Sequence, residues 1–285
     1  MRWTPLIAAL WLVADPVDST FDQKAQEQRE QSAARLKLMK ETAARIEIRV
    51  EEKDGPKLEL RAQPILRWDN HRSFVVDAAT FAWLDDHRPQ VIGGMWIKNG
   101  HAYFELQSTS AKPLIATVDG TARWSTRRPG IPWQAVEGGP APAASRAERL
   151  RQMKKLAQEF SAHAVKTAPD YDEGSTWHLR MMAQPIYRYA EESAVDGAIF
   201  AFAQGIDPEA FLIFESRPDE DIGQWHFGIA PACVWELHAK RGDREVWSRP
   251  KWLHEDTDTI YGLVGPFAVD PKLFPPEMIK SKLTR

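Results

Sequence analysis

The chain has 285 residues, a net charge of −3 and an isoelectric point near 6.3, and 43% of its residues are hydrophobic. A chain with balanced charge lacks the basic surface that neutralises phosphate groups, so the composition excludes nucleic acid as a partner. The length suits about two domains of ordinary size.

The first residues have the pattern of an export signal. Arg2 supplies a positive start, and an apolar stretch covers residues 5–14. This stretch is too short for a bilayer core of ~30 Å, which favours a cleaved signal peptide over residues 1–19. Cleavage after Ala14 or after Ser19 both fit. The sequence therefore predicts an exported protein, periplasmic or extracellular, that is not an integral membrane protein; the alternative is a buried first helix.

A first unit is expected over residues 20–133. Thr20 and Gln23 have the spacing of a helix cap, and Leu36, Met39 and Ala43 form one apolar stripe of that helix. Alternating or continuous apolar runs then predict strands over residues 46–50, 58–68, 74–84, 91–98, 101–107 and 113–118.

The clearest turn is Asn99-Gly100, which suits a two-residue type I′ hairpin. This turn pairs Lys98 with His101 and Trp96 with Tyr103. One face of the hairpin then carries the predicted core residues Met95, Ile97, Ala102, Phe104 and Leu106. The other face carries Trp96, Lys98, His101, Tyr103, Glu105 and Gln107.

A linker without regular structure is predicted over residues 134–145, which are rich in glycine and proline. Ser145 and Glu148 have capping-box spacing and predict a second helix. Its apolar stripe is Leu150, Met153, Leu156, Ala157 and Phe160. Strands are expected over residues 210–215 and 224–230. A second unit is thus predicted over residues 146–266, followed by a loosely held tail over residues 267–285.

The two predicted units repeat one pattern in the same order. Matching segments are residues 35–40 with 149–154, 62–68 with 183–189, 76–83 with 195–202, and 124–125 with 247–248. We therefore predict an α+β fold built by tandem duplication, in which each unit packs one N-terminal helix on a curved antiparallel sheet of five or six strands.

Three segments of the second unit carry a resemblance. The sequence of residues 184–189, that of residues 196–209, and Arg244-Glu245-Val246-Trp247-Ser248-Arg249-Pro250 resemble a group of exported proteins from planctomycete-type bacteria. The resemblance covers most of the mature chain, and it implies no named activity, ligand or cofactor.

The sequence contains no established catalytic motif. A nucleophile elbow, a glycine-rich phosphate loop, a zinc-protease motif and a cysteine pair are all absent, so no catalytic residue, metal site or cofactor is predicted. Cys233, the only cysteine, lies in an apolar run typical of a buried inert thiol rather than a nucleophile. Residues 254–258 favour a solvated turn over a calcium loop.

Two further sets of polar residues have alternative interpretations. Asp85, Asp86 and His87 could offer metal ligands, but neighbours on one loop rarely converge on one ion. Arginine and aspartate recur at matching places, as Arg67 with Asp77 and as Arg188 with Asp196. This recurrence favours structural ion pairs over a binding device.

The candidate binding residues are Trp96, Tyr103, His101 and Lys98. A Trp–Tyr pair among polar side chains could stack on a sugar ring or an extended partner segment; alternatively, the other unit covers this face. We predict a non-catalytic binding or scaffolding protein of the cell envelope, whose partner is an envelope protein or a glycan. The alternative is a carboxylate-dependent hydrolase acting in the cleft between the units, with Asp85, Asp86 and Glu215 as candidates. Converging carboxylates with shifted pKa values would favour the hydrolase.

Overall fold

A computed structural model describes residues 19–52, 55–73, 75–98, 100–166, 174–190, 196–216, 223–253 and 260–273. The apolar stretch of the predicted signal, Asn99 of the hairpin turn, residues 254–258 and the chain after Leu273 lie outside the described residues. None of the helices in the described part combines the length and the hydrophobicity needed to cross a bilayer.

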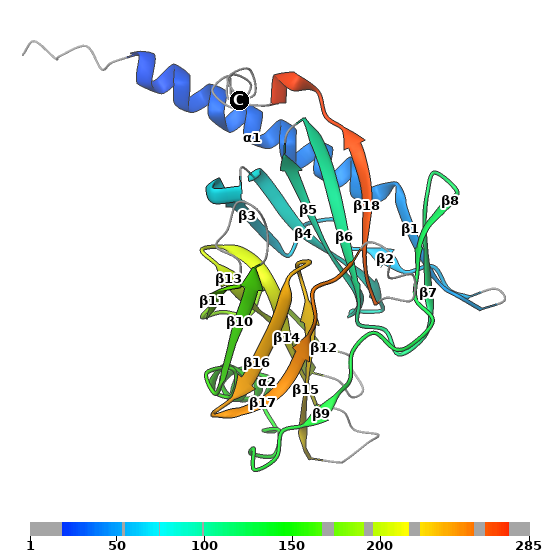
Figure 1. Cartoon of the computed structure of the whole chain (residues 1–285), viewed down its shortest axis with the longest axis vertical. Coiled ribbons are helices and arrows are strands. Elements are labelled where there is room, and N and C mark those ends of the chain that lie inside the picture. Colours follow the sequence, from blue (N-terminus) through cyan, green and yellow to red (C-terminus); the bar gives the residue numbers. More distant parts are fainter. Residues whose placement is uncertain are drawn as a thin grey trace, which may run out of the picture.

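The predicted α+β class, with two helices and curved, mainly antiparallel sheets, is confirmed (Figure 1). Helix α1 (Ser19–Ala44) crosses the first group of strands, and residues 23–30 of this helix are exposed. Helix α2 (Arg146–Ala157) packs on the second group through Met153, Leu156 and Ala157. Ser145 caps α2 by accepting a hydrogen bond from the Glu148 amide at 3.2 Å, as the sequence predicts.

The first group of strands forms two antiparallel sheets joined by one bridge. Its strands are β1 (Ile46–Val50), β2 (Glu59–Leu60), β3 (Leu66–Asn70), β4 (Val75–Asp85), β5 (Arg88–Lys98), β6 (His101–Ser108), β7 (Leu114–Val118) and β8 (Thr121–Ser125). A three-stranded sheet has the order β1-β7-β8. A six-stranded sheet, which also contains β18 (Tyr261–Ala268), has the order β18-β6-β5-β4-β2 with β3 also on β4. The bridge between Arg49 and Lys57 links the two sheets.

The second group forms one sheet of nine strands. These strands are β9 (Gln134–Ala135), β10 (Phe160–Lys166), β11 (Ser175–Met181), β12 (Tyr187–Ala190), β13 (Asp196–Gln204), β14 (Asp207–Ser216), β15 (Trp225–Pro231), β16 (Glu236–Arg241) and β17 (Arg244–Arg249). Their order is β17-β16-β10-β11-β13-β14-β15-β9, with β12 also on β13. The sheets thus hold nine, six and three strands, instead of five or six in each unit.

Two edge strands come from the part of the chain that builds the other sheet: β9 follows β8 of the first group, and β18 follows β17 of the second group. Strand β9 lies in the segment predicted as an unstructured linker, and it pairs with β15 at the edge of the second sheet. Strand β18 (Tyr261–Ala268) follows the second group but pairs with β6 of the first sheet. Figure 1 shows β18 rising from the lower group into the upper one. Edge strands need a partner, and this exchange supplies one to each sheet.

One predicted strand differs from the structure, whereas the predicted hairpin register is confirmed. Residues 58–68 were expected as one strand, but β2 and β3 are separate, because Pro64 lies between them and lacks a backbone donor. The hairpin of β5 and β6 has the predicted register, with Lys98 opposite His101 and Trp96 opposite Tyr103.

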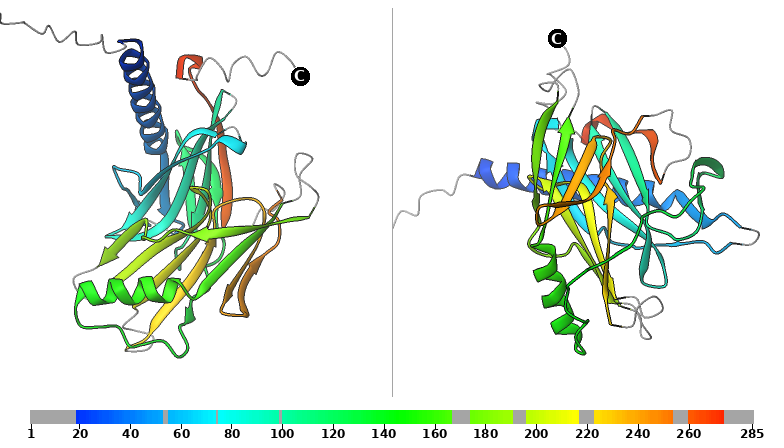
Figure 2. Two further views of the ribbon diagram at one scale, coloured as in Figure 1. Left: turned by 90° about the vertical axis from the view of Figure 1, so that its left-hand side faces the viewer. Right: turned by 60° about the horizontal axis from the view of Figure 1, so that its bottom comes forward.

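The three largest hydrophobic clusters of the described residues join the helices to the sheets and the two groups to each other. One joins α1 to the first sheets and includes Met39, Phe81 and Phe104, and a second joins α2 to the other sheet. A third lies between the groups, where Ile92 and Ile131 pack with second-sheet residues such as Ile199 and Ile213. The two groups therefore pack against each other through the sheet faces that do not contact the helices. Figure 2 shows the two groups from two further directions. This burial of both sides explains why β4, β5, β13 and β14 read as nearly continuous apolar runs.

Candidate functional site

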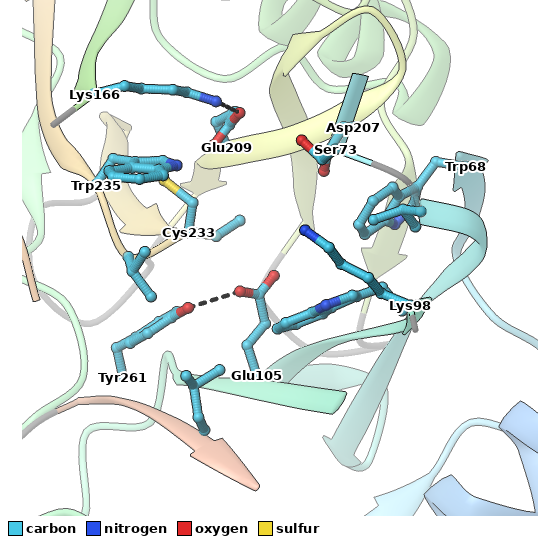
Figure 3. Close-up of a pocket in the computed structure, with 15 residues that line it drawn as sticks. Trp68, Ser73, Lys98, Glu105, Lys166, Asp207, Glu209, Cys233, Trp235 and Tyr261 are labelled. Atoms are coloured by element: carbon cyan, nitrogen blue, oxygen red, sulfur yellow. Dashed lines mark hydrogen bonds and ion pairs between the residues drawn. The ribbon is translucent and has the colours of Figure 1, made fainter. Parts of the chain in front are cut away.

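A cavity of about 260 Å³ lies between the two groups of strands (Figure 3). Its aromatic walls are Trp68, Trp96, Trp235 and Tyr261, and its polar lining includes Glu105, Asp207, Glu209, Lys98, Lys166 and Cys233. Trp68, Trp96, Lys98 and Glu105 come from the first group, whereas Asp207, Glu209 and Lys166 come from the second. Cavities of this kind, apolar walls with a few polar groups where two bodies meet, are the usual form of a small-molecule site.

Two of the acids come from the start of β14. Pro208 and Ala210 pair with the consecutive residues Ala203 and Phe202 of β13, so Glu209 is the extra residue of a β-bulge. Asp207 and Glu209 both line the cavity. Glu105 projects from β6 on the opposite side of the cavity, where it alternates with the core residues Phe104 and Leu106.

Asp207 is neutral at pH 7. Burial, and then the nearby negative charge of Glu209, raise the pKa of Asp207 to about 8. Asn70 Nδ2 donates a hydrogen bond of 2.6 Å to Asp207 Oδ2 and, with Lys166, partly opposes this rise. Asp207 therefore presents a carboxylic acid, which both donates and accepts hydrogen bonds.

Glu209 has a different environment although it is only two residues away. Lys166 Nζ lies 2.7 Å from Glu209 Oε1, and both side chains are almost fully buried. The same ammonium donates to Gln204 Oε1 at 3.0 Å and lies over the Trp177 ring. Glu209 is therefore held by an ion pair with Lys166, whereas Asp207 is held by the amide of Asn70.

Glu105 and Tyr261 form a second buried polar pair. Tyr261 Oη donates to Glu105 Oε2 at 2.7 Å. Burial raises the pKa of Glu105 well above its ordinary value, and the charges of Asp207 and Glu209 act in the same direction. Burial, followed by the charge of Glu105, likewise raises the pKa of Tyr261. The cavity thus holds two acids, Glu105 and Asp207, whose pKa values are raised mainly by burial.

Cys233 lines the cavity beside Glu209. Burial, and then the charge of Glu209, raise the pKa of its thiol well above the ordinary value. Because the thiolate is the reactive form, this environment fits the inert thiol predicted from the sequence.

The cavity takes up two of the four predicted binding residues. Trp96 and Lys98 line it, and Tyr103 stacks on Trp96 with ring centroids 5.8 Å apart. His101 is exposed at the end of the hairpin, outside the cavity lining. The second group covers the far part of this hairpin face, so Glu105 and Gln107 are buried there.

The acids proposed for a hydrolase from the sequence do not come together. Asp85, the last residue of β4, and Asp86, which has a φ of 53° in the turn that follows, are both exposed. Glu215 is buried and accepts hydrogen bonds from Arg88 at 2.7 and 3.2 Å and from Tyr189 at 2.6 Å. The structure instead assembles Glu105, Asp207 and Glu209, which sequence reasoning missed. A usable signal was Asp-Pro-Glu directly before a strongly apolar strand, since carboxyl groups are rarely placed where they will be buried.

The recurring arginine–aspartate pairs are structural. Asp77 accepts from Arg67 on β3 and from Arg35 on α1. Asp196 accepts in the same way from Arg188 on β12 and from Arg149 on α2. Each aspartate ties a helix to its sheet, away from the cavity.

Comparisons of the chain with protein-family models, with curated protein sequences and with solved structures found no match. Among the described residues, no group of three or more histidine, cysteine, aspartate and glutamate side chains is arranged to hold a metal ion.

Proposed function

We propose that this chain binds a sugar unit in the cavity between its two groups of strands, as an exported binding protein of the cell envelope. The observation that carries the proposal is the combination of aromatic walls with two acids of raised pKa in one cavity. A sugar ring has an apolar C–H face that stacks on indole rings, and a rim of hydroxyl groups that donate and accept hydrogen bonds. Trp68 and Trp96 supply the first kind of contact, and Glu105, Asp207 and Lys98 supply the second.

A comparison of two equivalent corners supports a ligand at this place. Strand β5 corresponds to β14, and β3 corresponds to β12. Arg88 and Asp207 are the first residues of β5 and β14, and Trp96 and Glu215 are the ninth. Trp68 and Tyr189 are the third residues of β3 and β12. In the closed corner, Arg88, Glu215 and Tyr189 fill the space with an ion pair. In the open corner, Asp207, Trp96 and Trp68 occupy the same strand positions around the cavity.

The closed corner suggests that the fold does not itself require a cavity. At the same strand positions, Arg88, Glu215 and Tyr189 are joined by hydrogen bonds. Voids and uncompensated buried polar groups both reduce stability. The open corner therefore lowers the stability of the free protein, and binding of a ligand there would offset this loss.

The test is retention of sugars by the full chain. We expect the wild type to retain a subset of a glycan array, and its tryptophan fluorescence to change on titration with the retained sugars. Trp96→Ala should weaken binding at least tenfold, because a stacking face is lost. Lys98→Met, which keeps the length of the side chain, should also weaken it.

The matched control is His101→Ala, on the same hairpin but outside the cavity lining. This variant should bind like the wild type. Circular dichroism checks that every variant is folded. The proposal fails if the wild type retains no sugar, or if Trp96→Ala and Lys98→Met bind as well as the wild type.

Tandem duplication is part of the proposal. The order β8-β7-β1-β2-β4-β5-β6-β18, counting the Arg49–Lys57 bridge, parallels the order β17-β16-β10-β11-β13-β14-β15-β9. The arginine–aspartate clusters on α1 and α2 also correspond. These correspondences support two copies of one unit that exchange their last strands.

Export is the remaining part of the proposal, and it is tested by N-terminal sequencing of the protein recovered from the cell envelope. A first residue directly after Ala14 or after Ser19 is the expected result. An intact Met1 would contradict a cleaved signal.

A further inference from the structure

We propose that the sugar bound in the cavity carries an acidic group, a carboxylate or a sulfate, and that the Lys98 ammonium pairs with this group. This inference rests on the proposed sugar binding and narrows the ligand to acidic sugars. It follows from the pairing of charges among the described residues. Each acid that lines the cavity has a partner in the chain, whereas Lys98 has none.

Lys98 projects into the cavity from the same strand face as Trp96. The two residues stand two apart on β5, and the pairing of β5 with β6 is regular there, with Trp96 opposite Tyr103 and Lys98 opposite His101. Side chains at this spacing in a regular strand share one face. Both residues line the cavity, and Figure 3 shows the Lys98 side chain pointing into it. A sugar ring stacked on the Trp96 indole would therefore have the ammonium within reach of its substituents.

The three acids of the lining are held by donors of the chain. Each has a donor at 2.6–2.7 Å, namely Tyr261 for Glu105, Asn70 for Asp207 and Lys166 for Glu209. A positively charged ligand would have to share one of these carboxyl groups with its donor. The acids therefore do not single out a cationic ligand.

Lys98 differs from Lys166, the other lysine of the lining. Lys166 is almost fully buried in its ion pair with Glu209. Lys98 is half-buried and, within the described parts of the chain, has no hydrogen bond or ion pair. An ammonium that a ligand shields from water needs an acceptor in its place, and a negatively charged oxygen is the strongest acceptor that a sugar can bring. The open position at Lys98 therefore favours a ligand with an acidic group.

The closed corner shows how the chain itself satisfies a cation between the two groups. There, the Arg88 guanidinium of the first group donates to the Glu215 carboxylate of the second group at 2.7 and 3.2 Å. Lys98 comes from the other end of the same strand, β5. Among the residues that the structure describes, no carboxylate forms an ion pair with it. An acidic group of the ligand would give Lys98 the partner that Glu215 gives to Arg88.

The acids of the lining leave room for a negative ligand. Burial raises the pKa of Asp207 to about 8 and raises the pKa of Glu105 well above its ordinary value, so burial opposes a negative charge on both groups. The charge of Glu209 is balanced by Lys166. The negative charge that would repel an acidic sugar is therefore much smaller than three carboxyl groups suggest.

Further cations lie against two of the aromatic walls. Arg249 lies over the Tyr261 ring, with Cζ 5.0 Å from the ring centroid. Lys251 Nζ and Lys166 Nζ lie 5.5 and 5.7 Å from the centroid of the Trp235 ring. Summed positive charge of this kind around a cavity raises the local concentration of anions. The surroundings of the cavity therefore agree with the pairing proposed for Lys98.

The experiment compares matched sugars that differ only in the acidic group. The probes are glucuronic acid with glucose, galacturonic acid with galactose, and glucose 6-sulfate with glucose, each titrated against the full chain by tryptophan fluorescence. The wild type should bind at least one acidic sugar about tenfold more tightly than its neutral parent, because a charge-assisted hydrogen bond is gained. The carboxylate and sulfate arms show which acidic group the cavity prefers.

Variants of Lys98 test the assignment of the cation. Lys98→Met should reduce the preference for the acidic sugar to less than about twofold, whereas Lys98→Arg, which keeps the charge, should retain at least about a threefold preference. Lys240→Met is the matched control, because Lys240 is exposed on β16 outside the cavity lining and its loss changes the net charge equally. This control should keep the wild-type preference. Circular dichroism checks that each variant is folded.

The outcomes separate this inference from the proposed function. If sugars bind but every neutral parent binds as tightly as its acidic partner, the acidic ligand is overturned and sugar binding stands. Tighter binding of glucosamine, whose amine is positively charged, than of glucose overturns it as well. If Lys98→Met keeps the preference, the assignment of Lys98 is overturned. If neither acidic nor neutral sugars bind, both proposals fail.

Discussion

Two acidic side chains of β14, Asp207 and Glu215, lie between the same groups of strands but in different electrostatic surroundings. Glu215 is only 2% exposed and has the Arg88 guanidinium beside it. Asp207 has an amide beside it and a carboxylate nearby, which together with burial favour its neutral form. Sequence position alone gives no indication of this contrast, because both residues flank the same apolar strand.

The raised pKa of Asp207 makes stability depend on pH. An aspartate in an unfolded chain loses its proton near pH 3.9, whereas folded Asp207 keeps it to about pH 8. Between these values the folded protein holds one more proton, so the free energy of unfolding falls as pH rises. The substitution Asp207→Asn removes this dependence of stability on pH.

We therefore expect Asp207→Asn to gain stability relative to the wild type as the pH is raised from 5 to 8. Urea unfolding at both pH values measures the difference. Asp85→Asn, at an exposed position, should show no such trend. A difference between Asp207→Asn and the wild type that stays constant with pH would contradict the burial argument.

The ion pair between Arg88 and Glu215 in the closed corner contributes to stability, and substitutions can measure this contribution. Arg88→Met leaves the Glu215 carboxylate buried without its guanidinium, which should lower the free energy of unfolding by about 3 kcal/mol. The double variant with Glu215→Met should recover part of this loss, because no buried charge remains. Chemical unfolding measures both. If Arg88→Met is as stable as the wild type, the ion pair adds nothing to the free energy of unfolding.

At the scale of elements, β18 is the strand whose position depends most on packing. Gly262 lies opposite Leu106 on β6, and a Cβ at this glycine would come within 2.3 Å of the Trp124 ring. Trp124 on β8 is itself buried, so the ring has little space to move. The absence of a side chain at position 262 allows β18 to close the first sheet.

Gly262→Val should therefore destabilise the protein by about 2 kcal/mol through overpacking. Thermal or urea unfolding measures this loss. Ala268→Val is the matched control, because Ala268 is on the same strand but exposed, and its change should be close to zero. Equal effects of the two substitutions would contradict the close packing of Gly262 against Trp124.

At the scale of the whole molecule, the exchanged strands bind the two groups to each other. In the chain, β9 follows the strands of the first group but pairs with β15 of the second sheet. Likewise, β18 follows the strands of the second group but pairs with β6 of the first sheet. Neither sheet keeps its edge strand if the other group unfolds. The shared cluster around Ile92 and Ile213 adds hydrophobic contact between them. Each group therefore depends on the other for its stability.

We expect the chain to unfold in one cooperative transition. Tryptophan fluorescence and far-ultraviolet circular dichroism, followed through a urea titration, should give coincident curves. Two separate transitions would mean that each group is stable without the strand it receives.

Local patterns in the sequence were enough to predict much of this architecture. The Asn99-Gly100 turn and the alternation around it gave the correct register of β5 and β6, and the core residues Met95, Ile97 and Phe104 are buried as expected. Ser145 and the stripe from Leu150 to Ala157 located α2, whereas Phe160, the last residue of the predicted stripe, is the first residue of β10. These features depend on neighbours within a few residues, whose geometry is fixed by the backbone.

The tertiary structure alone decided where the last strands go and which acids meet. Alternation along β6 predicts on which side of the strand Glu105 lies. It does not predict which segment of the chain covers that side. Asp207 and Glu209, a hundred residues later in the chain, face Glu105 only because the second sheet packs against the first. Burial by a distant segment also sets the protonation of these acids, since desolvation depends on everything that surrounds a group and not on its sequence neighbours.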